Sequence, residues 1–279
     1  MEVKILTNLH IIEGGIGKHL QFTALFNGLV KKEKRKLALM SGWPELFQND
    51  DRVLSSQLHH TDPFKDTSHT LFQNYKNIIF NEPNKSNFLK GDKHIINYWA
   101  SMYELENVDT LPDFKINKVR EQAIKNEILK LNKFILVQFT GGQGVKQNMY
   151  DSNNGGRNYK HGQEVINLLK EEIPNLNIIV FGHDNEQEQL LNVTQSIFVD
   201  KLDFMILAKY CLSFLCIDSS LQHICSNKDF NKKGVVLWGT TKKNMYGYEK
   251  NCNLMTEHPY AIDIEPKIIV DNFLKLDLQ

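Results

Sequence analysis

The chain has 279 residues, of which 41% are hydrophobic and 24% charged. These are ordinary globular proportions, so the composition excludes disordered, collagen-like and fibrous proteins. The 33 Lys and Arg residues balance 33 Asp and Glu residues, so no overall positive field favours nucleic acid. No apolar run reaches the roughly 18 residues of a membrane span, and the first residues lack the basic-then-apolar layout of a signal peptide. At about 150 residues per domain, the length predicts two domains.

The first half of the chain begins with alternating strand-like and helical segments. In chain order, we expect a strand at 3–8, a glycine-rich turn at 13–17, a helix at 20–30 and a second strand at 37–40. This order predicts a βαβ unit. Residues 50–120 are less regular, with a further strand indicated at 77–80 and a helix that begins near residue 94. A Lys-rich amphipathic helix at 117–132 ends this half.

The second half repeats the same pattern. Apolar strands are expected at 133–139, 177–182, 212–217 and 234–239, with a short strand-like segment at 197–199. Helices are expected at 161–172, 186–191, 204–209, 221–225 and 266–276. Near-continuous apolar strands that alternate with helices are typical of parallel sheets buried on both faces.

Two such halves predict an α/β protein with two Rossmann-like, doubly wound domains that face a cleft. We expect the domains to span residues 1–130 and 131–279. Ligands of such sheets bind beyond the carboxyl ends of the strands. The loops after residues 8, 140, 182, 217 and 239 are therefore the places to look for a site.

The four cysteines, Cys211, Cys216, Cys225 and Cys252, form no CxxC pair, and three of them lie in a stretch that reads as core. Free cysteine in such a place behaves as a small hydrophobe. We therefore expect neither a disulfide framework nor a zinc site, and a reducing cytoplasm fits best.

Three glycines, Gly14, Gly15 and Gly17, lie between the first strand and its helix. They let the backbone approach a ligand closely, and a helix start supplies N–H groups that suit a phosphate or an oxyanion. The segment is not the dinucleotide-binding pattern, and it is not a Walker A loop, because the GK pair is followed by His19. From the glycines alone, a structural turn and a binding turn are equally supported.

The segment from Asp218 through Ser219 and Ser220 to His223 is the most distinctive of the chain. It follows an apolar strand and opens a helix, where Asp or Ser is a cap and the first N–H groups can hold a diphosphate. The next strand ends in Gly239-Thr240-Thr241, whose hydroxyls and amides can donate to phosphate oxygens. Each segment alone reads as a helix cap or a turn, and together they favour phosphate binding.

The loop at 146–160 carries the cations Lys146, Arg157 and Lys160 among glycines and asparagines. A cationic loop beside a helix start suits a diphosphate. For any one of the three residues taken alone, a solvated surface loop is the better explanation.

Taken in order, these blocks resemble the heptosyltransferase-like family (glycosyltransferase family 9) of GT-B enzymes. Residues 14–25 resemble the family's opening turn and helix. Residues 218–223 and 235–241 resemble its D-S-G-P-x-H helix start and the L-F-G-x-T strand that follows. Between them, residues 134–139, Arg157-Asn158-Tyr159 and 178–182 match its strand, its K-x-W loop and its strand that ends in glycine. The resemblance covers roughly the first 40 residues and most of 133–250.

The resemblance implies a glycosyltransferase that moves a sugar from a nucleotide-diphosphate donor to an acceptor hydroxyl. The second domain would hold the nucleotide, the first would hold the acceptor, and the last helix would pack back on the first domain. The substrate-binding residues expected on these grounds are Gly14, Gly15, Gly17, Lys18, Lys146, Arg157, Lys160, Gly182, Asp218, Ser219, Ser220, His223, Gly239, Thr240 and Thr241. Helix N-termini and cations would stabilise the leaving diphosphate, so we expect no metal and no cofactor beside the donor substrate.

The chain departs from the family pattern at the general base. Members of the family usually have Asp directly after the glycine of the first turn, where this chain has Lys18. A lysine acts as a base only with a strongly lowered pKa, so we expect Glu13 as the base, with His19 as the second candidate. Ser220 and Leu221 replace the Gly and Pro of the D-S-G-P block.

The usual acceptor in such families is a lipopolysaccharide core sugar, so we expect a lipopolysaccharide or another surface glycan. The expected location is the cytoplasm, with a peripheral place at the inner membrane as a variant of it. A hydroxymethylated base of phage DNA is the alternative acceptor. The neutral net charge weighs against DNA, although Lys31 to Lys36 offers a cationic helix end.

Two other classes of function remain open. A non-catalytic nucleotide-sugar-binding protein is motivated by Lys18 in place of the family's Asp, and a donor-hydrolysis assay separates it from an enzyme. A nucleotide-sugar epimerase would need an acid–base pair, and the sequence offers no clear one.

Overall fold

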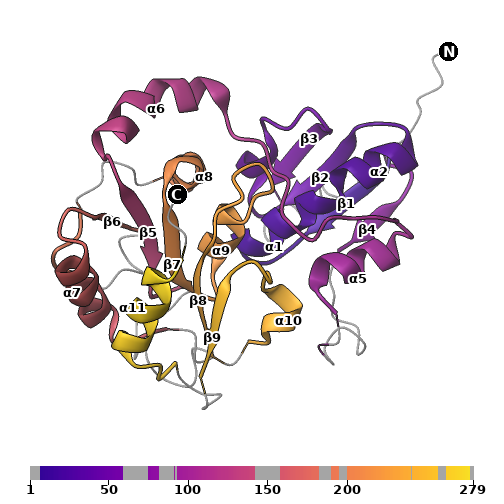
Figure 1. Ribbon diagram of the computed structural model, residues 1–279. Coiled ribbons are helices and arrows are strands. Elements are labelled where there is room, and N and C mark those ends of the chain that lie inside the picture. The colour runs from indigo at the N-terminus through magenta and orange to yellow at the C-terminus, as the bar shows by residue number, and fades with distance from the viewer. Residues whose placement is uncertain are drawn as a thin grey trace. The chain divides into compact units, whose positions relative to one another are not determined.

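The computed structural model describes residues 7–58, 75–81, 91, 93–141, 158–181, 190–194, 200–239, 241–256 and 262–276. The chain divides into two compact units, residues 1–115 and 116–279. Each unit contains a parallel sheet with helices beside it (Figure 1), which confirms the α/β prediction. None of the described helices is both long enough and apolar enough to cross a membrane.

The sheet of the first unit has four parallel strands in the order β3-β2-β1-β4. The strands are β1 (Leu9–Ile12), β2 (Leu37–Ser41), β3 (Val53–Leu58) and β4 (Ile78–Phe80). The helices are α1 (Ile16–Phe22), η1 (Thr23–Leu25), α2 (Phe26–Glu33), η2 (Pro44–Phe47) and α5 (Ile95–Met102).

Two strands of the first unit differ from the sequence prediction. The first strand that the structure describes lies at 9–12, where the apolar residues pair with β2 and β4. Of the predicted strand at 3–8, residues 3–6 lie outside the described residues, and Thr7 and Asn8 belong to no strand. Strand β3 was not predicted. It is an edge strand with a polar centre, Ser55-Ser56, so it lacks the apolar run that marks the buried strands.

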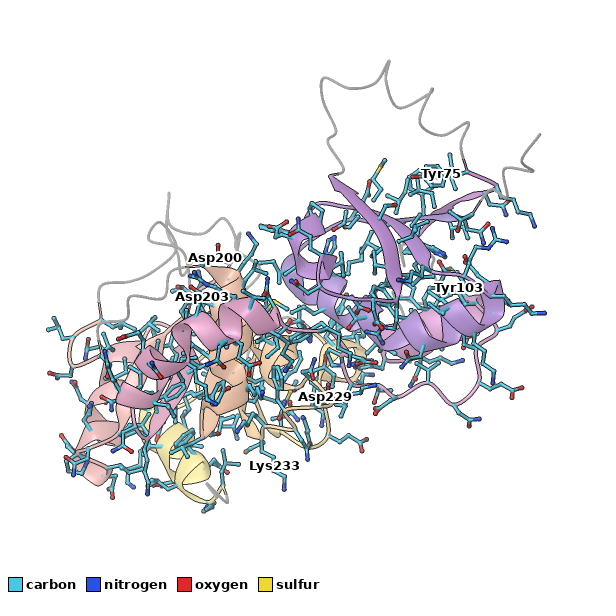
Figure 2. All side chains as sticks on the ribbon, turned by 90° about the horizontal axis from the view of Figure 1, so that it is seen from above. Tyr75, Tyr103, Asp200, Asp203, Asp229 and Lys233 are labelled. Atoms are coloured by element: carbon cyan, nitrogen blue, oxygen red, sulfur yellow. The ribbon has the colours of Figure 1, made fainter. Side chains whose placement is uncertain are left out.

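A buried hydrogen-bond network fixes β1 against the helices beside it. The ring of His10 is fully buried in β1 and lies between Tyr103 and Glu33, with its Nδ1 3.0 Å from the Tyr103 hydroxyl and its Nε2 2.8 Å from Glu33 Oε1. Tyr103 follows α5 and is labelled in Figure 2, and its hydroxyl donates to Asn81 after β4. Because buried polar groups need partners, this network holds β1 in place, and β1 leads into the glycine turn.

The sheet of the second unit has five parallel strands in the order β6-β5-β7-β8-β9. The strands are β5 (Phe134–Gln138), β6 (Asn177–Val180), β7 (Ser213–Ile217), β8 (Gly234–Trp238) and β9 (Cys252–Met255). The helices are α6 (Lys118–Lys130), α7 (Gly162–Glu172), α8 (Lys201–Tyr210), α9 (Ser220–Cys225), α10 (Lys243–Tyr246) and α11 (Pro266–Leu274).

The four predicted apolar strands of the second half are all present, and β9 is an addition. It is a partly exposed edge strand, so its sequence carries little of the apolar signal. The predicted helix at 186–191 falls largely outside the described residues, and the strand-like segment at 197–199 lies wholly outside them.

Helices cover both faces of this second sheet. On one face, Ile135, Val137 and Leu215 join the apolar side chains of α7 and α11 in one core cluster. On the other side, α9 packs on β7 and β5, and α8 packs on α9 (Figure 1). All four cysteines are free thiols, and three of them are buried.

Helix α6 belongs to the second unit, so the units divide after residue 115 rather than after residue 130. Its contacts explain why. Arg120 forms two hydrogen bonds with Asp203 of α8 (2.7 and 2.8 Å), and Glu121 accepts from Lys209 (2.5 Å) and the Tyr210 hydroxyl (2.7 Å). Figure 2 labels Asp203 at the start of α8. Long-range contacts of this kind leave no local mark on the sequence of α6.

The apolar face of α11 packs into the core of the second unit. Ile269, Val270 and Phe273 are buried in the same core cluster as α7. The expectation that the last helix also reaches the first domain stays a prediction.

Glu121 anchors α6, and its substitution by glutamine tests that anchor. Burial raises the pKa of this carboxyl, but hydrogen bonds from Lys209, Tyr210 and Lys118 outweigh burial and lower the pKa to about 2. A pKa below that of the unfolded chain stabilises the fold above about pH 4.5, and that stability is lost as the pH falls toward about 2. Glu121→Gln should therefore lower the free energy of unfolding by about 1–3 kcal/mol near neutral pH, and by much less in acid.

Glu127→Gln is the matched control, because Glu127 lies on the same helix and pairs with the exposed Lys130. Such surface pairs contribute about 0.2–1 kcal/mol. Urea unfolding over a pH series measures both variants, and equal losses at every pH would contradict the anchoring role of Glu121.

Candidate functional site

The carboxyl ends of β5, β7 and β8 lie side by side at one edge of the second sheet, because β7 pairs in parallel with both neighbours. Gln138 ends β5, Asp218 follows β7, and Gly239 follows β8. Asp218 and Gly239 were predicted as site residues and Gln138 was not, and the parallel pairing brings all three to the same end of the sheet. This is where open parallel sheets bind ligands.

Ser219 and Gln138 join two of these strand ends. The Ser219 hydroxyl donates to Gln138 Oε1 over 2.5 Å. Ser219 is also the N-cap residue of α9, with extended backbone angles, but its hydroxyl makes no capping bond. The N-cap side chain therefore leaves the first N–H groups of α9 available to an acceptor from outside the helix.

Gln222 and Asp218 form a second buried contact at the same helix start. Gln222 Nε2 donates to Asp218 Oδ1 over 2.6 Å, and the Gln222 side chain is fully buried. The Gln222 Oε1 and Thr241 Oγ1 atoms are buried without a hydrogen-bond partner among the described residues. Buried polar atoms in native proteins nearly always have a partner. These two atoms are therefore candidate contacts for a ligand at this end of the sheet.

The chain returns to the β5 end at residues 158–160. The Gly141 N–H donates to Asn158 Oδ1 (3.0 Å), and the Tyr159 N–H donates to the Phe139 carbonyl (2.9 Å). Lys160 follows directly and is exposed, so it lies beside the predicted site. Four other predicted residues lie outside the described residues: Lys146, Arg157, Gly182 and Thr240.

His223 lies inside α9 and is 5% exposed. Its Nδ1 is 2.7 Å from the hydroxyl of Tyr248, a residue that is 3% exposed and follows α10. The two rings meet edge to face, with centroids 5.6 Å apart. Sequence reasoning found His223 but not Tyr248, because nothing local to Tyr248 marks it as a partner.

In the first unit, the predicted glycine turn follows β1 and opens α1. Gly14 has φ +98°, a conformation that favours glycine, and Gly15 is the N-cap residue of α1. The Lys18 side chain folds back over the turn, with its Cδ 3.2 Å from the place of a Cβ on Gly14. Trp43, which follows β2, donates from its indole N–H to the Gly14 carbonyl (3.2 Å). Trp43 is a neighbour of this turn that the sequence motifs did not indicate.

His19 braces this turn from the inside. The side chain is fully buried, and its Nδ1 and Nε2 lie 2.9 Å from the Gly15 carbonyl and 3.0 Å from the Ile12 carbonyl. Burial lowers the pKa of His19, against the opposing effect of these two carbonyls. A neutral imidazole has a single N–H, so His19 donates to one of these two carbonyls in either tautomer, and its ring faces the backbone of its own turn. Glu13 lies at the same turn and is partly exposed.

Metal ligands are a separate question. Among the described residues, no group of three or more His, Cys, Asp or Glu side chains is placed to hold a metal ion. The polar groups gathered at the edge of the second sheet are mainly amides and hydroxyls, which suit an anionic ligand better than a cation.

No protein-family model and no curated protein matches the chain. Solved structures do match it. A family 9 glycosyltransferase from Veillonella parvula has a TM-score of 0.66 at 11% identity, with 92% of this chain and 87% of that chain covered. The ADP-heptose lipopolysaccharide heptosyltransferase II of E. coli has a TM-score of 0.64 at 14% identity, with 96% and 97% covered. The E. coli heptosyltransferase WaaC, solved with ADP, has a TM-score of 0.64 at 10% identity, with 97% and 99% covered.

At these identities the likeness concerns the fold. It confirms the predicted GT-B class, with two parallel-sheet domains, and the resemblance to heptosyltransferase-like proteins over most of the chain.

Replacement of Gly14 tests whether the turn needs its positive φ. Gly14→Ala places a Cβ on a backbone that L-residues rarely adopt, so it should lower the free energy of unfolding by about 1–3 kcal/mol. Gly15→Ala is the matched control, because Gly15 has φ −76° and no atom lies within 4 Å of its Cβ position. Chemical denaturation measures both, and an equally small effect in the two variants would show that the turn carries no such requirement.

Proposed function

We propose that the chain is a glycosyltransferase, which moves a sugar from a nucleotide-diphosphate donor to an acceptor hydroxyl. The observation that carries the proposal is the carboxyl edge of the second sheet. There the start of α9, the Ser219–Gln138 contact and the end of β8 meet, in a fold like that of a heptosyltransferase solved with ADP.

The donor's diphosphate would bind at this edge. As the sugar leaves, negative charge grows on the diphosphate, and the N–H groups of α9 can stabilise that charge together with Ser219, Ser220 and the hydroxyls of Thr240 and Thr241. Arg157, Lys146 and Lys160 would add positive charge from the loop before α7. These groups would make a metal unnecessary. The ADP in a structural neighbour makes ADP the first nucleotide to test.

The first unit would hold the acceptor, and Glu13 would take the proton of its hydroxyl. Glu13 follows β1 directly and shares its turn with Gly14 and Gly15, so it stands at a carboxyl strand end as the second-unit residues do. His19, the second candidate, is committed to two backbone carbonyls. Lys18, over the turn, would bind an anionic part of the acceptor or donor.

The acceptor would be a surface glycan, with a lipopolysaccharide sugar as the first class to test. A hydroxymethylated DNA base is the second candidate, on the strength of the cationic end of α2. That surface is already partly used within the first unit, because Lys32 donates to the Tyr103 carbonyl (2.8 Å) and to Glu104 (3.1 Å). A cytoplasmic enzyme, free or peripheral at the inner membrane, fits a glycan acceptor best.

Nucleotide binding tests the donor site. We expect ADP, measured by calorimetry beside GDP and UDP, to bind about 10-fold or more weakly to His223→Ala and to Arg157→Ala, because a charge-assisted hydrogen bond to phosphate is worth about 1.5–3 kcal/mol. Lys233→Ala is the control. Lys233 is exposed and directly precedes β8, so it lies at the amino end of that strand, whereas the proposed site lies at the carboxyl end. Figure 2 labels it. Unchanged affinity in both site variants would mean that the donor site lies elsewhere.

Turnover tests the base. Glu13→Gln should lower the rate of ADP release from ADP-heptose by about 10²–10⁴-fold while ADP affinity stays near that of the unmodified chain, since only proton transfer is removed. Glu106→Gln, an exposed glutamate of the same unit, is the control. Full turnover in Glu13→Gln would remove Glu13 from the mechanism. Donor binding without any turnover in the unmodified chain would favour a non-catalytic nucleotide-sugar-binding protein.

A further inference from the structure

The contact between His223 and Tyr248 is a buried pair from two distant parts of the chain. His223 is the fourth residue of α9, the helix whose first residues belong to the proposed donor site, and Tyr248 comes from the segment between α10 and β9. The 2.7 Å between Nδ1 and the hydroxyl oxygen is a short hydrogen bond. With exposed fractions of 5% and 3%, neither group exchanges this partner readily for water.

The backbone that carries Tyr248 is itself fixed. Asn253 of β9 accepts from the indole N–H of the buried Trp238 (2.8 Å) and donates to the Tyr248 carbonyl (3.0 Å). The Asn251 N–H donates to the same carbonyl (3.1 Å). Tyr248 is therefore tied to the ends of β8 and β9 through its backbone, and its side chain is directed at α9.

Gly247 lets this segment pass closely over Trp238. A Cβ on Gly247 would lie 2.8 Å from a ring carbon of Trp238 and 2.8 Å from the Lys243 carbonyl oxygen, closer than real Cβ contacts allow. The close approach brings the next residue, Tyr248, to a fixed place against α9. Three neighbouring elements, β8, β9 and α9, thus combine to hold one phenol hydroxyl against one imidazole nitrogen.

A hydroxyl held in this way can select the tautomer of a histidine. A neutral imidazole carries its proton on one ring nitrogen, and the other nitrogen is an acceptor. If the Tyr248 hydroxyl donates to Nδ1, the proton of His223 is on Nε2. An N–H donor is what a diphosphate requires, because phosphate oxygens accept hydrogen bonds. A neutral ring supplies this N–H donor without the cost of a buried positive charge.

We propose that Tyr248 is a positioning residue of the donor site, whose hydroxyl holds the His223 imidazole in the Nε2–H tautomer and in one ring orientation, so that it donates to the donor's diphosphate. The proposal rests on the proposed function. It adds to that function a residue outside every motif that the sequence presents. Tyr248 itself touches no substrate and acts through His223.

The test compares Tyr248→Phe with His223→Ala and with the double variant, using ADP as the probe and the full chain. Tyr248→Phe keeps the ring and removes only the hydroxyl, and we expect ADP affinity to fall about 3–10-fold, the scale of one hydrogen bond. Because Tyr248 acts through His223, Tyr248→Phe should change nothing further in the His223→Ala background. Tyr246→Phe, a half-buried tyrosine of α10, controls for the loss of a phenol hydroxyl from the same segment.

A second readout reports the tautomer itself. In the chain labelled with ¹⁵N-histidine, the His223 signal is identified by its loss in His223→Ala. It should show protonated Nε2 and unprotonated Nδ1, and Tyr248→Phe should shift it toward a mixture of tautomers. A residue with a merely structural role would leave this signature in place.

Several results would overturn the proposal. One is wild-type ADP affinity in Tyr248→Phe, and another is an equal loss with and without His223. A His223 signal with the proton on Nδ1 would overturn it as well. These outcomes differ from failure of the proposed function, in which the unmodified chain binds none of ADP, GDP and UDP.

Discussion

The parallel pairing of β7 with β5 and with β8 is the constraint on which the account depends. Parallel strands all end at the same edge, so three loops that are far apart in the sequence meet there. The apolar core on one face holds the three strands in this register, because Ile135, Leu215 and Val235 pack in one cluster. The contacts between Ser219 and Gln138 and between Gln222 and Asp218 are consequences of that registration. A one-residue slip of β7 would turn its side chains to the opposite face.

Each unit has a buried histidine near the start of a helix that follows a parallel strand. In the first unit, β1 ends in a turn that needs a positive φ at Gly14, and a buried histidine braces it from inside. In the second unit, β7 ends at a helix start whose histidine lies 2.7 Å from a tyrosine hydroxyl. In both, an imidazole near a helix start is fixed by oxygen atoms. His19 is held by carbonyls of its own turn, whereas His223 is held by a side chain more distant in the sequence.

Much of this architecture follows from the sequence, and the exceptions have physical causes. The buried strands were predictable because each is a near-continuous apolar run, as in residues 134–138 and 234–238. The edge strands β3 and β9 were not, since one side of each lacks a neighbour and their residues are more polar. Asp218, Ser219 and His223 could be proposed as site residues because a strand end and a helix cap leave local marks in the sequence. Gln138, Trp43 and Tyr248 could not be predicted, because they reach their neighbours only through contacts between distant parts of the sequence. The burial of His19 was not predictable from the local sequence either.

Amide hydrogen exchange of the full chain, with and without ADP, tests directly whether the donor binds at the carboxyl ends of β5, β7 and β8. If the diphosphate binds at the carboxyl edge of the second sheet, the amides of residues 218–223 should become strongly protected, because the ligand accepts from the start of α9. The amides near Lys233, at the amino end of β8, should exchange at the same rate with and without ADP. Protection confined to the glycine turn of the first unit, with residues 218–223 unchanged under saturating ADP, would contradict the account.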